Sequence, residues 1–306
     1  MWRAVAKHAR QQIVHADPNN VDEILKLWYM RLLALTKLGL NQLASAEFEK
    51  LGDLNRAELK NEETGESFVP YELWILWGRL PFFLKFPSIT LERLTMLGVH
   101  CKKMQKRNSN NKSIWEKREI QTYLILATHW IAMKEYSPAA LTMKYILEKV
   151  PDDIDVLSGL GRLYLQMGDL ESASTMFRKM DAYKSKEGAE EAIQINKGFE
   201  YIAKGEWEQA RDVLEKVYQS NNENLLVLSN LAVCQVYLGQ LAKAIEVLET
   251  LTLQNPTTAG TCETALNNLC TLYELRYEDP TEKKIDVVKQ VARWTGDSFQ
   301  PDCLKL

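Results

Sequence analysis

Residues 154–177 read IDVLSGLGRLYLQMGDLESASTMF, and this stretch decides the fold. Its apolar residues recur with a helical period until Gly168, and a second helical pattern follows and runs to Phe177. Glycine is the residue that most easily takes the left-handed backbone conformation that ends a helix. The small residues Gly161 and Ala173 would let two helix backbones approach closely. The stretch therefore predicts a helix–turn–helix unit.

The same unit returns along the chain. The alanine at the position of Ala173 recurs at spacings of 34, 37 and 34 residues, as Ala139, Ala210 and Ala244. The glycine at the position of Gly168 recurs as Gly205 and Gly239. A period of 34 residues with small residues at fixed positions is typical of the tetratricopeptide repeat (TPR), which is one helical hairpin per repeat. We therefore predict an all-α TPR α-solenoid, a right-handed superhelix of antiparallel helix pairs.

The chain divides into four predicted regions. Residues 1–58 form N-terminal helices with a degenerate TPR-like unit, and residues 59–119 form an aromatic-rich helix, a second helix and a basic flexible loop. Residues 120–256 hold four repeats, and residues 257–306 form capping helices and a tail. The approximate repeat boundaries are 120–153, 154–187, 191–224 and 225–258.

Two features of the second region leave alternatives open. Residues 68–86 are the densest aromatic stretch, and they fit either a helix buried between neighbouring units or a partner-binding surface. Four basic residues precede an Asn-rich segment, and they fit either a solvated loop or a contact with an acidic partner or an acidic lipid surface. These basic residues are Lys102, Lys103, Lys106 and Arg107.

A protein-binding groove follows from the repeat positions. The first helix of each TPR unit lines the concave face, and the residues at the groove positions are mainly apolar. They are Leu124, Ile131, Ile195, Phe199, Ile202, Val233, Val236 and Tyr237. An apolar groove suits an amphipathic helix, either from a partner or from the C-terminal helix of this chain. The Lys and Asn set that clamps chaperone tails is missing.

Composition excludes several classes of protein. The chain has 306 residues, 46% hydrophobic and 26% charged, and its net charge of −3 does not favour binding to nucleic acid. It contains no run of 18 apolar residues, so we expect no direct transmembrane contact. Five cysteines without a C-x-x-C pair indicate a reducing compartment.

No pattern of residues predicts chemistry. A phosphate-binding G-x4-G-K-[ST] motif and an H-E-x-x-H zinc motif are absent, and the four histidines are scattered. The run 159–164 begins like a dinucleotide fingerprint but lacks its third glycine and any preceding strand. We therefore expect no enzyme activity, no catalytic residue, no cofactor and no metal.

The C-terminal region carries a resemblance to a known family. The runs NNLCTLYEL at 267–275 and ARWTGD at 292–297 resemble the C-terminal TPR region of the subunit-twelve family of the transport protein particle (TRAPP) complex, and the similarity extends over all 306 residues. Members of that family carry a long additional N-terminal segment. The resemblance implies a non-catalytic scaffold of a vesicle-tethering complex in endoplasmic reticulum to Golgi transport. The assembled complex would act as an exchange factor for Rab-type GTPases, and this subunit would contribute to its assembly.

The same resemblance implies partners and a location. The partners would be other TRAPP subunits, with peripheral membrane association through the complex. The location would be the cytoplasm, at the surface of the endoplasmic reticulum–Golgi intermediate compartment and the Golgi. The alternative that the residues leave open is a transient TPR adaptor that recognises a peptide or a membrane outside that complex.

Overall fold

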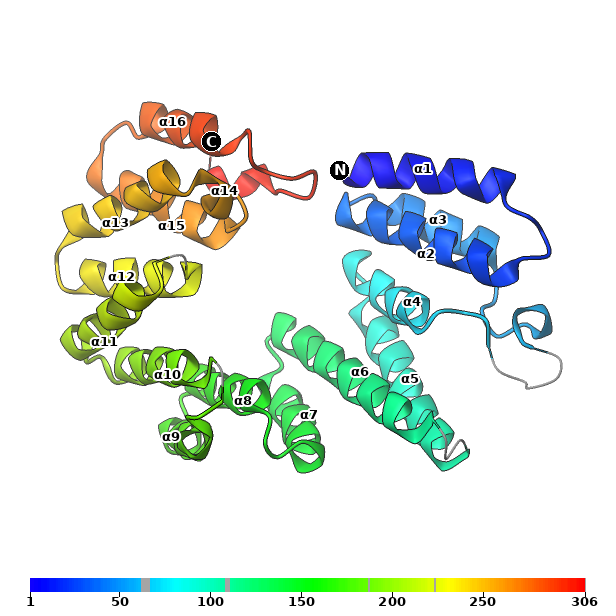
Figure 1. Ribbon diagram of the computed structural model, residues 1–306. Helices are drawn as coiled ribbons and strands as arrows, with labels where there is room; N and C mark the ends of the chain where they lie inside the picture. The colour runs from blue at the N-terminus through cyan, green and yellow to red at the C-terminus, as the bar shows by residue number, and fades with distance from the viewer. Residues whose placement is uncertain (62–66, 108–110, 187, 223, 306) are drawn as a thin grey trace. The chain divides into compact units, whose positions relative to one another are not determined.

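The computed structural model of the protein describes residues 1–61, 67–107, 111–186, 188–222 and 224–305. Over these ranges the secondary structure is helical, apart from one isolated bridge between Lys60 and Ser67 (Figure 1). None of the described helices is both long enough and apolar enough to cross a membrane. The chain forms two compact units, Met1–Ile146 and Leu147–Leu306.

The first unit is built from helical hairpins. Helix α1 packs on α2, α4 packs on α5, and α5 packs on α6. The helices are α1 (Trp2–His15), α2 (Val21–Lys37), α3 (Asn41–Leu51), η1 (Ala57–Leu59), α4 (Tyr71–Phe83), α5 (Pro87–Arg107), α6 (Lys112–Ala132) and α7 (Tyr136–Lys149), whose last residues extend into the second unit.

The second unit stacks further hairpins in chain order. Helix α8 packs on α9. Helix α10 packs on α8, α9 and α11, and helix α12 packs on α11 and α13. The helices are α8 (Ile154–Met167), α9 (Leu170–Met180), η3 (Asp181–Tyr183), α10 (Ala189–Lys204), α11 (Trp207–Ser220), α12 (Leu225–Tyr237), α13 (Leu241–Gln254), α14 (Pro256–Ala259), α15 (Glu263–Arg276), α16 (Thr281–Val291) and η4 (Pro301–Leu304).

The turns form where the sequence predicts them. Gly168, Gly205 and Gly239 have φ angles of 78°, 77° and 75°, so each takes the left-handed conformation after the first helix of its hairpin. Polar side chains begin two of these helices: Asp153 accepts hydrogen bonds from the backbone at the start of α8, and Asn224 does so at the start of α12.

The boundary between the two units lies inside one predicted repeat. It falls after Ile146, within α7, whereas the repeat prediction places residues 120–153 in a single hairpin. The predicted division into four regions therefore stays a prediction.

Small residues set the distance between paired helices. The alanines Ala139, Ala173, Ala210 and Ala244 all have 0% exposed surface. A methyl group added to Gly161 would lie 2.3 Å from the Phe177 ring of the paired helix, which is far inside van der Waals contact. The repeat positions that are small in the sequence are thus the points of closest approach between helices.

The close contact between the helices at Gly161 predicts the effect of adding one methyl group there. Gly161→Ala should lower the free energy of unfolding by about 1–3 kcal/mol, because overpacking against Phe177 outweighs the better helix propensity of alanine, about 1 kcal/mol. Urea denaturation measures the change. Gly198→Ala is the matched control, since its methyl group would meet the flexible end of Leu214 at 2.8 Å and should cost less. A more stable Gly161→Ala variant would contradict the close approach.

The aromatic helix α4 is mainly a core helix. Leu73, Leu76 and Leu80 pack with residues of α2 and α3, whereas Tyr71 and Ile75 pack with Cys101 of α5. Because opposite sides of α4 join two clusters, most of its apolar surface is already covered within the unit. Phe83 and Phe86, at and just after its end, are exposed.

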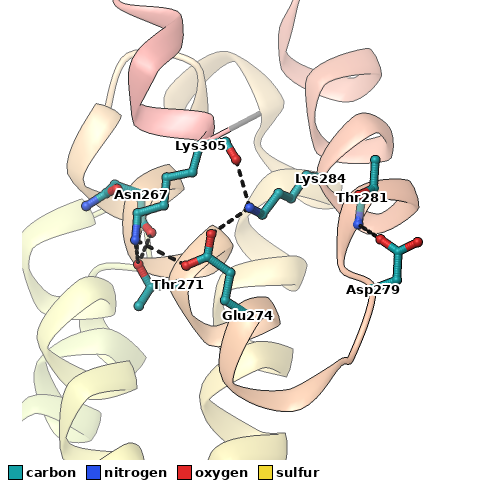
Figure 2. Close-up of polar contacts among 7 residues, drawn as sticks. All are labelled: Asn267, Thr271, Glu274, Asp279, Thr281, Lys284 and Lys305. Atoms are coloured by element: carbon teal, nitrogen blue, oxygen red, sulfur yellow. Dashed lines mark hydrogen bonds and ion pairs between the residues drawn. The ribbon is translucent and has the colours of Figure 1, made fainter.

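The C-terminal tail closes on the last hairpin. The buried Nζ of Lys284 donates to Glu274 Oε1 at 2.6 Å and to the carbonyl oxygen of Lys305 at 2.8 Å (Figure 2). Lys305 Nζ in turn donates to Thr271 Oγ1 at 2.7 Å, and Leu304 is buried among α15 and its neighbours. These bonds tie η4 to α15 and α16, so the tail covers apolar surface of the last hairpin.

Candidate functional site

The predicted groove residues fall into two groups. Leu124 and Ile131 lie on α6 of the first unit, and the other six lie on α10 and α12 of the second unit. Each of the two groups is therefore described within its own unit. The second group is the larger, and it is the one whose neighbours are best defined.

Ile195 is a correction to the predicted groove. Only 4% of its surface is exposed, and it packs with Ala210 and Leu214 of α11 in a buried cluster. Phe199 and Ile202 are partly buried against the same cluster. The sequence pattern places Ile195 on the apolar side of α10, but the paired helix covers that side, so Ile195 cannot contact a partner.

Helix α12 presents an exposed apolar line. Tyr237 is 64% exposed, and its ring stacks on Trp207 with 3.9 Å between ring centroids and 3° between ring planes. Leu226, which the groove prediction missed, is also exposed, and Val233 between them is half-buried. These three residues are spaced by seven and four positions, so they share one side of the helix over about 16 Å. We call Leu226, Val233 and Tyr237 the α12 stripe.

The polar residues near Phe199 on α8 and α10 are engaged within the unit. Arg162 Nε donates to Asn196 Oδ1 at 2.8 Å, and its guanidinium lies 4.9 Å from the centroid of the Phe199 ring. Burial lowers the pKa of Arg162 from its ordinary value. Asn196 is itself buried and donates through Nδ2 to Ser158 Oγ at 2.9 Å. Helices α8 and α10 are therefore joined by a satisfied polar network.

A second pair of helices is joined in the same way. Asn268 Nδ2 of α15 donates to Ser229 Oγ of α12 at 2.8 Å. Sequence reasoning missed both asparagines. The available signal was that Ser158 and Ser229 each occupy the fifth position of their repeats, with an asparagine 38 and 39 residues later.

The basic residues separate into one paired and three exposed side chains. Lys102 Nζ lies 3.9 Å from Glu119 Oε1 and 4.4 Å from the centroid of the Tyr145 ring, but its side chain is still 41% exposed, so its contact with a partner stays a prediction. Lys103, Lys106 and Arg107 are exposed in the last turns of α5, and thus lie on a helix. The predicted Asn-rich loop lies largely outside the described residues, at 108–110.

The cysteines of the chain are free thiols. Cys101, Cys234 and Cys270 are buried, and burial raises the pKa of both Cys234 and Cys270 to about 11. Thiols of this kind are poor nucleophiles at neutral pH. Within the described parts of the chain, no group of three or more His, Cys, Asp and Glu side chains is placed to hold a metal ion.

Comparison with known families bears directly on these hairpins. A tetratricopeptide-repeat family model matches residues 131–190 and 201–260, which include α7, α8, α9, α11, α12 and α13 but only the two ends of α10. The fold is a helical TPR solenoid.

Two curated relatives extend the similarity along the chain. It is 30% identical to trafficking protein particle complex subunit 12 of Mus musculus and 29% identical to the same subunit of Homo sapiens, in each case over 94% of the chain. The matched regions make up 40% and 43% of those proteins, so the chain spans less than half of their length.

Two solved structures are also similar. BtubC from P. vanneervenii is 18% identical with a TM-score of 0.49, over 71% of this chain and 87% of that chain. A tetratricopeptide repeat protein from Parabacteroides merdae is 13% identical with a TM-score of 0.48, over 95% of this chain and 98% of that chain.

Proposed function

We propose that this chain is a non-catalytic scaffold subunit of a TRAPP-like vesicle-tethering complex. The observation that carries the proposal is the similarity to trafficking protein particle complex subunit 12 over 94% of the chain. Its partners are other subunits of that complex, and it reaches the membrane peripherally through them. In this role it acts in endoplasmic reticulum to Golgi transport and supports assembly of a Rab guanine-nucleotide exchange complex.

The contact surface that we propose centres on the α12 stripe. Exposed aromatic residues that are held rigidly lose little conformational entropy when a partner covers them, and Tyr237 is held by its stack on Trp207. Phe199, Ile202 and Val236 are partly buried against neighbouring clusters and remain proposed contacts. An amphipathic helix of another subunit would bury its apolar side on this line. Leu124 and Ile131 remain proposed contacts in the first unit.

In this proposal the complex that the chain joins sets its location. A cytoplasmic protein with free thiols and peripheral recruitment fits the five unpaired cysteines. The self-filled groove is less well supported than a partner-filled one, because α16 packs against α13, α14 and α15 at the far end of the array.

A charge placed on the α12 stripe tests the proposal. The double variant Leu226→Asp/Tyr237→Asp should reduce recovery of TRAPP subunits in a tagged pulldown at least about tenfold, since a buried aromatic anchor contributes about 2 kcal/mol or more to binding. Quantitative mass spectrometry of the co-purified proteins gives the ratio. Both side chains are exposed, so the thermal unfolding curve should shift only by the loss of the Tyr237–Trp207 stack, about 1 kcal/mol.

Leu253→Asp provides the matched control. Leu253 on α13 is 64% exposed, the same fraction as Tyr237, but it lies on a different helix. Equal recovery from wild type and the double variant would remove the α12 stripe as the contact surface. Absence of TRAPP subunits from the wild-type sample would overturn the scaffold assignment in favour of a transient adaptor.

A further inference from the structure

Helix α5 has an exposed side that no other described helix of the first unit covers. Three of its apolar residues, Ile89, Met96 and Val99, are exposed, and Met96 reaches 64%. The exposed basic residues Lys103, Lys106 and Arg107 continue the same side toward the end of the helix. We call these six residues the α5 face.

The opposite side of α5 fixes this face in place. Leu94, Gly98 and Cys101 are buried toward α4 and α6. A methyl group added to Gly98 would lie 2.9 Å from the Tyr123 ring of α6, so the two helices are in close contact. A helix held this tightly on one side cannot rotate to hide its exposed apolar residues. The α5 face is therefore a preformed surface.

The charges of the α5 face are uncompensated. No ion pair joins Lys103, Lys106 or Arg107 to an acid in the described ranges, whereas neighbouring Lys102 has Glu119. Glu92 is the one acid among the exposed residues of α5, and it lies more than two turns before them. Burial lowers the pKa of His100, and the positive charges of Lys103, Arg107 and Lys60 lower it further.

The two units carry net charges of opposite sign, and the unit that holds the α5 face is the positive one. Residues 1–146 carry 21 Lys and Arg against 15 Asp and Glu, whereas residues 147–306 carry 17 against 26. The basic end of α5 thus belongs to a basic unit within a chain of net charge −3. An acidic ligand is attracted to this unit and repelled by the other.

We propose that the α5 face binds an amphipathic helix of a partner protein that begins with an acidic turn. The apolar residues of that helix would cover Met96, Val99 and Ile89, and its acidic turn would pair with Lys103, Lys106 and Arg107. Acidic residues are favoured in the first turn of a helix by its dipole. The partner helix therefore lies antiparallel to α5, with its start at the end of α5.

Two other occupants fit the face less well. If a second copy of this chain were the occupant, its α5 would lie antiparallel on the first. Each α5 carries three exposed cations and one exposed carboxylate, so the interface between the two copies would be strongly positive. An anionic membrane would accept the cations, but insertion of Met96 and Val99 would also press Glu92 and Thr95 toward the lipid. An acidic protein helix can cover the apolar residues, pair with the basic ones and place a polar side chain beside Glu92, which lipid tails cannot do.

Photocrosslinking identifies the occupant directly. Met96 is replaced by p-benzoylphenylalanine in the 306-residue chain, and the crosslinked peptide from cells is sequenced by mass spectrometry. Leu141 of α7, which is 66% exposed in the same unit, is the control position. The captured segment should carry two or more acids in one turn, followed by apolar residues at helical spacing.

A synthetic peptide of the captured segment then tests the charges. Its Kd for the triple variant Lys103→Glu/Lys106→Glu/Arg107→Glu should rise at least about tenfold, and should also rise with salt for the wild type. The control variant Lys37→Glu/Lys50→Glu/Lys134→Glu makes the same charge change at exposed lysines of this unit and should leave the Kd within about twofold.

Several results would overturn the proposal. These are a captured segment without acids, a captured second copy of this chain, or no capture at Met96 above the level at Leu141. Flotation with phosphatidylserine vesicles that is lost in the triple variant would assign the face to a membrane instead. The inference is independent of the α12 stripe, because every substitution lies in the first unit and leaves Leu226 and Tyr237 in place.

Discussion

Arg31→Leu should lower the free energy of unfolding by about 3–5 kcal/mol, which is the range expected when one partner of a buried ion pair is removed. The side chains of Arg31 and Glu47 are 12% and 10% exposed. Arg31 donates through Nε to Glu47 Oε2 at 2.6 Å and through Nη2 to the other carboxylate oxygen, and its Nη1 donates to the carbonyl oxygen of Ala6 at 2.8 Å. One guanidinium thus joins α1, α2 and α3, and its loss leaves a buried carboxylate without its partner.

Two further variants show whether the uncompensated charge is the cause. Arg31→Leu/Glu47→Leu should recover most of the lost stability, because the second substitution removes the unpaired carboxylate. Lys26→Ala breaks an ion pair with Asp22 whose side chains are 63% and 51% exposed, and it should cost less than about 1 kcal/mol. Urea denaturation gives all the values. A double variant as unstable as Arg31→Leu alone would show that packing, not charge, dominates at this site.

Acidification from pH 7 to pH 4 should cost the protein about 3 kcal/mol through His129 alone. Burial, and then the positive charge of Arg79, lowers the pKa of His129 to about 4. Its ring is 4% exposed and lies 4.5 Å from the centroid of Phe82. The unfolded chain, with a histidine pKa of about 6.5, takes up a proton in this window that the folded chain does not.

The sign of the effect defines the experiment. Above about pH 6.5 His129 is neutral in both states and contributes no pH dependence, and stability is lost as the pH falls from there toward 4. Denaturation curves at pH 7, 6, 5 and 4 are compared for wild type and His129→Phe, in which the other titrating groups are unchanged. The wild type should lose more stability than the variant over this range. Parallel pH profiles would mean that His129 is protonated in the folded protein.

The repeat pattern predicted the fold because backbone geometry acts locally. A glycine with positive φ ends a helix wherever it occurs, so Gly168, Gly205 and Gly239 could be assigned from spacing alone. The 34-residue recurrence of Ala173 likewise predicted which helices pair, since only a small residue permits the close approach. The resemblance to the TRAPP subunit-twelve family was also confirmed from sequence.

The candidate surfaces were predictable only in part. Ile195 and Tyr237 occupy groove positions of the same repeat pattern, yet one is 4% exposed and the other 64%. Lys102 and Lys103 are adjacent in a basic run, yet only Lys102 meets a carboxylate. A periodic pattern gives the direction of a side chain from its own helix, but exposure depends on which other helix packs there.

The sequence by itself determined the helical hairpins, their turns and the apolar character of the first helices. Tertiary structure alone decided that α11 covers Ile195, that α5 keeps an exposed basic end, and that α16 and η4 close on α15 through Lys284. The physical reason is the distance along the sequence between the residues that interact. Helix formation and chain reversal depend on neighbouring residues, whereas desolvation of a side chain depends on residues tens of positions away that the fold brings into contact.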